Sequence, residues 1–232
     1  MKSRSRTFLR ATATAFTVLA SAASLHAVTI DFGDGAPGAP AGLQATGASL
    51  LFSGGGVNVT ATAWRNTSSS GGTFTAARLG QYSSGLGVSG TGGSDSDSDH
   101  EVDNIGTFDF VRLSFSQIVD VQSIRLEFVG SDSDLEVWFG NSGTLSTLYA
   151  SASAVSLAGN GDDRTAFLDS ANIIGQHMLI GAFTGGSNDS FKIRNITFNT
   201  TTNTVPDGGS TMLLLGVSLV GLGFAARRKK SV

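Results

Sequence analysis

Residues 111–115 read Val-Arg-Leu-Ser-Phe, and the same alternation returns at residues 124–128, Ile-Arg-Leu-Glu-Phe. In both stretches every second side chain is apolar, and the side chains between them are polar or charged. Successive side chains of a β-strand point to opposite faces of a sheet, so this period of two predicts strands with one buried face and one solvent-facing side. The two stretches favour a β fold.

Similar runs recur at residues 57–63, 135–139 and 191–198, and residues typical of turns, such as Gly, Asn, Asp and Ser, separate the runs. In the last run the apolar positions change parity at Asn195, as a β-bulge would make them. Helix is expected only as one or two turns within residues 166–174. We therefore predict an all-β domain, an antiparallel β-sandwich or jelly roll.

The N-terminal segment, residues 1–27, has the composition of an export signal. It begins with four basic residues and no acid, continues with an apolar run at about residues 11–23, and ends at Ala27. We predict a signal helix that is removed after Ala27, and cleavage after Ala22 or Ala23 is the alternative. The chain is then an exported protein.

The C-terminal segment, residues 205–232, has three parts in fixed order. A turn-forming motif comes first, then an uncharged apolar run at residues 212–226, and then a basic cluster. The motif consists of Val205, Pro206, Asp207, Gly208 and Gly209, and the cluster of Arg227, Arg228, Lys229 and Lys230. With two preceding residues the apolar run is about 17 residues long, the lower limit for a helix that crosses a bilayer. The basic cluster predicts a cytoplasmic C-terminus, which leaves residues 28–204 outside.

This order of motif, apolar helix and terminal basic cluster resembles the PEP-CTERM sorting signal, and the motif is closest to its Val-Pro-Asp-Ser-Gly variant. The resemblance implies that an exosortase-like transpeptidase is a partner of the tail. It also implies anchoring in the bacterial inner membrane in transit, and then a place at the cell surface or in the extracellular matrix. Segments at residues 100–104, 110–115 and 132–138 resemble the extracellular β-sandwich often found before such tails.

Composition narrows the function of residues 28–204, which we take as one domain. This region holds seven basic and 17 acidic residues, a net charge of −10, although the whole chain carries −3. An acidic domain repels phosphate backbones, so no nucleic-acid partner is expected. The chain has no cysteine, which removes thiol nucleophiles and thiolate metal sites.

The densest polar cluster is a candidate calcium site. Its carboxylates belong to Asp95, Asp97, Asp99, Glu101 and Asp103. Oxygen ligands of this kind suit calcium, and additional ligands could come from Asp132, Asp134, Asp162 and Asp163. The other reading of the cluster is a solvated, flexible loop between Gly- and Ser-rich flanks.

Carbohydrate binding and catalysis are two further candidate functions of the domain. Trp138 alternates with Val137 and Phe139, so it lies on the opposite face, where an exposed ring could stack on a sugar, although core packing is the default for a single Trp. Catalysis has little support, because the only histidines after the signal segment are His100 and His177 and no nucleophile motif is present. We expect no catalytic residues and a structural or adhesive role, with extracellular polysaccharide as a candidate partner. A calcium-dependent carbohydrate-binding module is the alternative.

Overall fold

The computed structural model describes residues 26–33, 42–68, 72–90, 100–130, 134–150, 155–157, 164–168, 173–182 and 188–200. Residues 25–203 form one compact unit, and the two ends, residues 1–24 and 204–232, are grouped separately. The predicted signal helix, sorting motif, apolar run and basic cluster all lie outside the described residues. Within the described ranges, no helix is long and apolar enough to cross a membrane.

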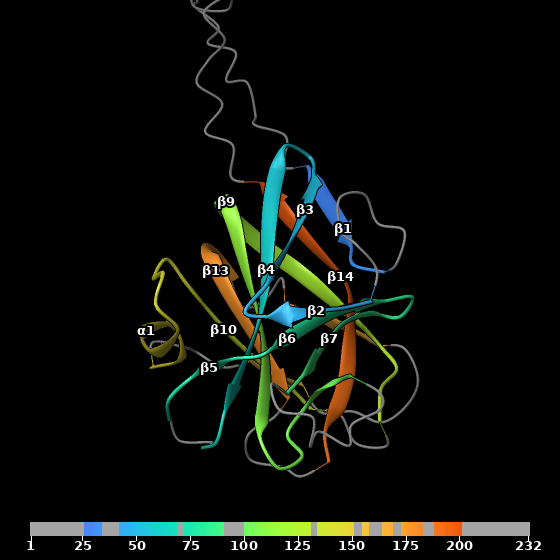
Figure 1. Cartoon of the computed structure of the whole chain (residues 1–232). Helices are drawn as coiled ribbons and strands as arrows, with labels where there is room; N and C mark the ends of the chain where they lie inside the picture. The colour runs from blue at the N-terminus through green and yellow to red at the C-terminus, as the bar shows by residue number, and fades with distance from the viewer. Residues whose placement is uncertain are drawn as a thin grey trace, which may run out of the picture. The chain divides into compact units, whose positions relative to one another are not determined.

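The described part of the chain is almost entirely β-structure, with one short helix (Figure 1). The strands are β1 (Ala27–Asp31), β2 (Gly42–Thr46), β3 (Ser49–Gly54), β4 (Val57–Asn66), β5 (Thr75–Ala76), β6 (Arg78–Tyr82), β7 (Gly85–Ser89), β8 (Val102–Asp103), β9 (Phe108–Glu127), β10 (Leu135–Gly140), β11 (Val155–Leu157), β12 (Arg164–Phe167), β13 (Ile173–Ala182) and β14 (Ser190–Thr200). The helix α1 (Leu145–Ala150) lies against β10 and β13. All strand pairs are antiparallel, which confirms the predicted all-β antiparallel class.

The long strand β9 organises the sheet, because its two halves have different neighbours. The first half pairs with β4 on one side and β13 on the other. The second half pairs with β14, and on its other side with β12 and the start of β13. Between the halves, His177 of β13 faces Ser114 whereas Gly175 faces Val119, so four residues of β9 lie opposite one residue of β13. This large irregularity, bigger than an ordinary β-bulge, lets one strand serve both parts of a nearly closed sheet.

Strand β14 joins the two ends of the domain. Along one edge it pairs with β9, and along the other it pairs with β1, where Ala27 faces Asn199 and Asp31 faces Asn195. Further along that second edge, β7 and β8 take the place of β1. The register shifts between Ile193 and Asn195, which confirms the bulge predicted from the parity change.

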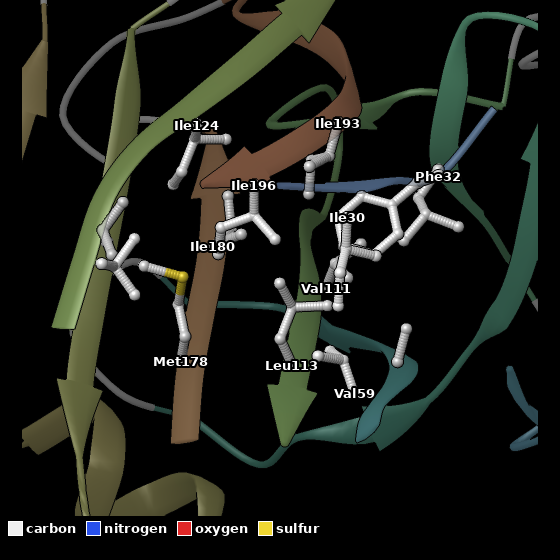
Figure 2. Close-up of a cluster of buried hydrophobic side chains, with 14 of the residues drawn as sticks. Ile30, Phe32, Val59, Val111, Leu113, Ile124, Met178, Ile180, Ile193 and Ile196 are labelled. Atoms are coloured by element: carbon white, nitrogen blue, oxygen red, sulfur yellow. The ribbon is translucent and has the colours of Figure 1, made fainter. Parts of the chain in front are cut away.

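The inner face of this sheet encloses the main hydrophobic core (Figure 2). Side chains from β1, β4, β9, β13 and β14 meet there, including Ile30, Val59, Leu113, Ile180 and Ile196. Strand β4 shows the expected alternation, since Val57, Val59, Ala61 and Ala63 are buried. The hairpin before it turns through Gly55 and Gly56, whose positive φ angles of 57° and 78° suit a two-residue turn that most side chains disfavour.

Three expectations about local structure were wrong. Of residues 166–174, those that the structure describes in β12 and β13 are strand and not helical turn, and residues 169–172 lie outside the described residues; the described helix is α1, which the sequence pattern did not reveal. The stretches at 111–115 and 124–128 are parts of one strand, not two. Phe128 does not continue the buried alternation, because its φ of 54° ends β9 and its side chain is 54% exposed.

A second, smaller hydrophobic cluster lies on the outer face of β9, β10 and β13. Phe110, Trp138, Leu148 and Leu179 are buried there, and Trp64, Phe74, Phe108, Leu145 and Tyr149 pack against them. Helix α1 provides Leu148 and Tyr149, so it covers a sheet face that would otherwise meet water. The sheet is therefore buried on both faces at this point.

Candidate functional site

Three chain segments far apart in sequence meet at Asp189, which directly precedes β14. Its Oδ2 accepts a hydrogen bond from the Asn104 side-chain amide at 2.7 Å, and its Oδ1 accepts one from the Asp134 backbone N–H at 2.9 Å. The Asp189 backbone N–H in turn donates to Asn104 Oδ1 at 3.0 Å. The Asp189 side chain is buried. One carboxylate thus holds together the starts of β14 and β10 and the connection between β8 and β9.

The same region holds the backbone positions with unusual geometry. Apart from glycines, positive φ angles within the described residues occur at His100, Phe128 and Asn188. The His100 ring stacks on Tyr82 at 5.5 Å, and Lys192 Nζ lies over the rings of Tyr82 and Phe128 at 5.0 and 4.3 Å. Burial raises the pKa of Tyr82, and Arg78 partly opposes the effect. Cation–π contact stabilises the buried Lys192, the one lysine of residues 28–204.

The predicted calcium ligands are only partly placed by the structure. Glu101 and Asp103 are buried beside this region, and Asp103 faces Ser190 of β14 and accepts a hydrogen bond from Ile105 N–H at 2.9 Å. Asp134 lies near them through Asp189, and its Oδ1 is buried without a hydrogen-bond partner. The remaining candidates (Asp95, Asp97, Asp99, Asp132, Asp162 and Asp163) lie outside the described residues. No group of three or more described His, Cys, Asp or Glu could hold a metal ion, so calcium binding stays a prediction.

Trp138 lies on the face opposite Val137, as expected, but its ring is not exposed. Val137 packs in the main core, whereas Trp138 belongs to the outer cluster and is 5% exposed. The Tyr149 ring of α1 lies 4.7 Å from it at an interplanar angle of 31°, and Phe110 contacts it edge-on at 5.7 Å. Trp138 therefore packs against other side chains, which is the default reading for it, and α1 covers the face that a sugar would need.

His177 lies on β13 at the edge of this outer cluster. Its Nδ1 is 3.2 Å from Arg112 Nη2 and 3.1 Å from Ser114 Oγ. A guanidinium can only donate, so Nδ1 accepts and the proton of the neutral imidazole is on Nε2. Burial lowers the pKa of His177, and the positive charge of Arg112 lowers it further. In hydrolases the serine and the orienting carboxylate bind different nitrogens of the histidine, whereas here Ser114 and Arg112 share Nδ1, and the arginine disfavours the imidazolium that a base must form.

This arrangement predicts how His177 affects stability as pH changes. The unfolded histidine binds a proton near its ordinary pKa of 6.5, whereas the folded one resists protonation to lower pH. The unfolded state therefore binds more protons as pH falls below that value, and stability is lost. In urea unfolding at pH 7.5 and pH 5.5, we expect His177→Gln to lose less stability on acidification than the wild type. Equal losses in the two proteins would contradict the prediction.

Together the all-β fold and the C-terminal segment define a class, the all-β protein with a C-terminal sorting signal. The segment at residues 204–230 matches the VPDSG-CTERM motif. The chain therefore carries a PEP-CTERM-like C-terminal sorting signal of the expected variant, which implies export toward the cell surface and processing by an exosortase-like enzyme. Comparison with curated proteins and with solved structures found no significant match.

Asp189 and Arg112, which connect strands that are distant in sequence, could not be selected from the sequence. Asp189 lies in a Gly-, Ser- and Asn-rich stretch that resembles other turns of this chain, and no local signal distinguishes it. In the sequence, Arg112 looks like any polar residue of an alternating strand. Its contact with His177 follows only from the register of β9 and β13.

Proposed function

We propose that the β domain is a structural or adhesive module of the cell surface or extracellular matrix, delivered there through its sorting signal. The observation that carries the proposal is the VPDSG-CTERM match at residues 204–230, directly after β14 ends at Thr200. The proposal includes a non-enzymatic role. Its support is the arginine beside His177, which disfavours the charged imidazolium that a general base must form.

The pairing of β14 supports a load-bearing role. The strand that leads into the sorting tail is hydrogen-bonded to β9 along residues 192–200 and to β1 along residues 195–199. A pull on the tail along the strand would have to break both ladders together. A domain anchored by its C-terminus benefits from such a double attachment.

The same proposal includes a β-sandwich architecture. Its support is the division of β9, which contributes one half to the β4–β13 side and one half to the β14 side, with the core residues between them (Figure 2). A calcium-dependent carbohydrate-binding module is the competing proposal. It would need rings other than the covered Trp138, and carboxylates beyond those that the structure describes.

Sorting is tested by changing Pro206 and Asp207 of the motif to alanine in the full-length chain. We expect the wild type to reach the surface or matrix fraction with a shortened C-terminus, and the variant to stay in the inner membrane at its unprocessed mass. Intact-mass spectrometry and cell fractionation measure both. Cells with the variant should lose as much matrix cohesion as cells that lack the protein.

The matched control for the motif variant is Ser53→Ala, an exposed position on β3. It should be sorted and processed like the wild type. If the motif variant is also sorted and processed normally, the sorting proposal is wrong. If sorting fails but matrix cohesion is unchanged, the structural or adhesive role is wrong.

A further inference from the structure

Arg112 is a partly buried cation without a carboxylate partner in the described part of the chain. Three other arginines of this acidic domain each contact a carboxylate: Arg65 Nε at 2.7 Å, Arg125 Nη2 at 3.1 Å and Arg194 Nη2 at 2.9 Å. Arg112 instead contacts the neutral imidazole of His177, and its Nε is buried without a hydrogen-bond partner. Burial lowers the pKa of Arg112. A desolvated cation of this kind favours an anion beside it.

The groups around Arg112 offer hydrogen-bond donors. Thr62 lies directly opposite Arg112 on β4, and its Oγ1 already accepts from Trp64 Nε1 at 2.9 Å, so its hydroxyl proton is available to a ligand. His177 uses Nδ1, the nitrogen that faces Arg112, for both of its hydrogen bonds, so its Nε2–H points away from the guanidinium and His177 holds Arg112 in place without contacting the ligand. The available donors are thus the Arg112 guanidinium and the Thr62 hydroxyl. Convergent donors of this kind match an oxyanion.

The indole of Trp64 adds an apolar surface beside these donors. Its hydrogen bond to Thr62 holds the ring next to the Arg112 position, and the side chain is only partly buried against the outer cluster. Aromatic side chains combine apolar contact area with low conformational cost, which suits the carbon face of a sugar ring. An oxyanion and a sugar ring in one ligand would satisfy both parts of this surface.

We propose that Arg112 and Thr62 bind the oxyanion of an acidic sugar, a uronate carboxylate or a sugar sulfate, with Trp64 against the sugar ring. The polysaccharide source of this ligand rests on the proposed function at the surface or matrix. Because residues 28–204 carry a net charge of −10, a polyanion is repelled at long range. Binding therefore depends on the short-range contacts of Arg112 and not on electrostatic steering.

The test uses the full-length chain in uncharged detergent micelles and three immobilised probes: polygalacturonate, dextran sulfate and neutral dextran. We expect at least about tenfold tighter binding to one of the anionic polymers than to dextran, since a charged hydrogen bond typically contributes this much. Arg112→Gln should lose that advantage. The polymer that binds identifies the oxyanion as carboxylate or sulfate. Equal binding to dextran, or no binding to any probe, overturns the proposal.

The matched control is Arg125→Gln, which removes an arginine that is already paired with Glu127. It should bind like the wild type, and an equal loss in both variants overturns the proposal. A measurement on the wild type alone covers the case in which Arg112→Gln does not fold. Free glucuronate or sulfate should raise the melting temperature while glucose does not. Wild-type chain that reaches the surface but binds no anionic polymer contradicts this inference and leaves the sorting proposal intact.

Discussion

Replacing Phe110 by alanine is expected to lower the free energy of unfolding by about 3–5 kcal/mol, the usual cost of removing a large buried aromatic ring. Phe110 is fully buried and contacts the rings of Phe74, Trp138 and Tyr149 at centroid distances of 5.4, 5.7 and 5.9 Å. Its ring also lies over Gly181, where a Cβ would come within 2.7 Å of it. The cavity left by alanine is bounded by a packed sheet and α1, so little collapse can fill it.

Urea unfolding followed by far-UV circular dichroism measures this effect. The matched control is Phe167→Ala, which removes the same ring from a side chain that is 70% exposed on β12. That variant should stay within about 0.5 kcal/mol of the wild type, as surface substitutions usually do. Similar losses for the two variants would show that the outer cluster does not form a real second core.

Replacing Arg65 by methionine is expected to cost about 3–5 kcal/mol, because it removes the arginine partner of a fully buried carboxylate. Arg65 Nε and Nη2 donate to Asp109 Oδ1 and Oδ2 at 2.7 and 3.3 Å, and the Asp109 side chain is 0% exposed. Arg65 of β4 lies opposite Asp109 of β9, so the replacement destabilises the pairing of β4 with the first half of β9.

A double-mutant cycle isolates the ion pair from other effects. Replacing Asp109 by leucine in the Arg65→Met background should recover part of the stability. The double variant no longer buries the Asp109 carboxylate without its arginine partner. Arg125→Met is the control, because its pair with Glu127 is more exposed and should contribute only about 0.2–1 kcal/mol. A loss for Arg65→Met no larger than for Arg125→Met would contradict the prediction.

Local pattern predicted the elements that depend on neighbouring residues. The alternation at residues 57–63 and 135–139 corresponds to β4 and β10, and the parity change near Asn195 marks a true register shift. Alternation does not show where a segment distant in sequence covers the polar face of a strand. Phe110 shares the side of β9 that carries the polar Arg112 and Ser114, yet α1 and neighbouring aromatic rings bury it.

The candidate sites show the same division. Glu101, Asp103 and Asp134 could be selected from sequence because carboxylates are conspicuous, but Asp189, which holds Asp134 and Asn104 together, could not. Its two partners are 55 and 85 residues away along the chain. The Arg112–His177 contact also depends on the pairing of β9 with β13, across 65 residues.

The sequence by itself determined the antiparallel β class and the sorting tail, because side-chain periodicity and the order of apolar and basic segments are properties of neighbouring residues. Only the tertiary structure decided which polar faces are covered, that Trp138 lies beneath Tyr149, and that Arg112 meets a histidine instead of a carboxylate. The physical reason is that strand partners such as Ala27 and Asn199 are chosen by the packing of the whole core, which no short stretch of chain contains.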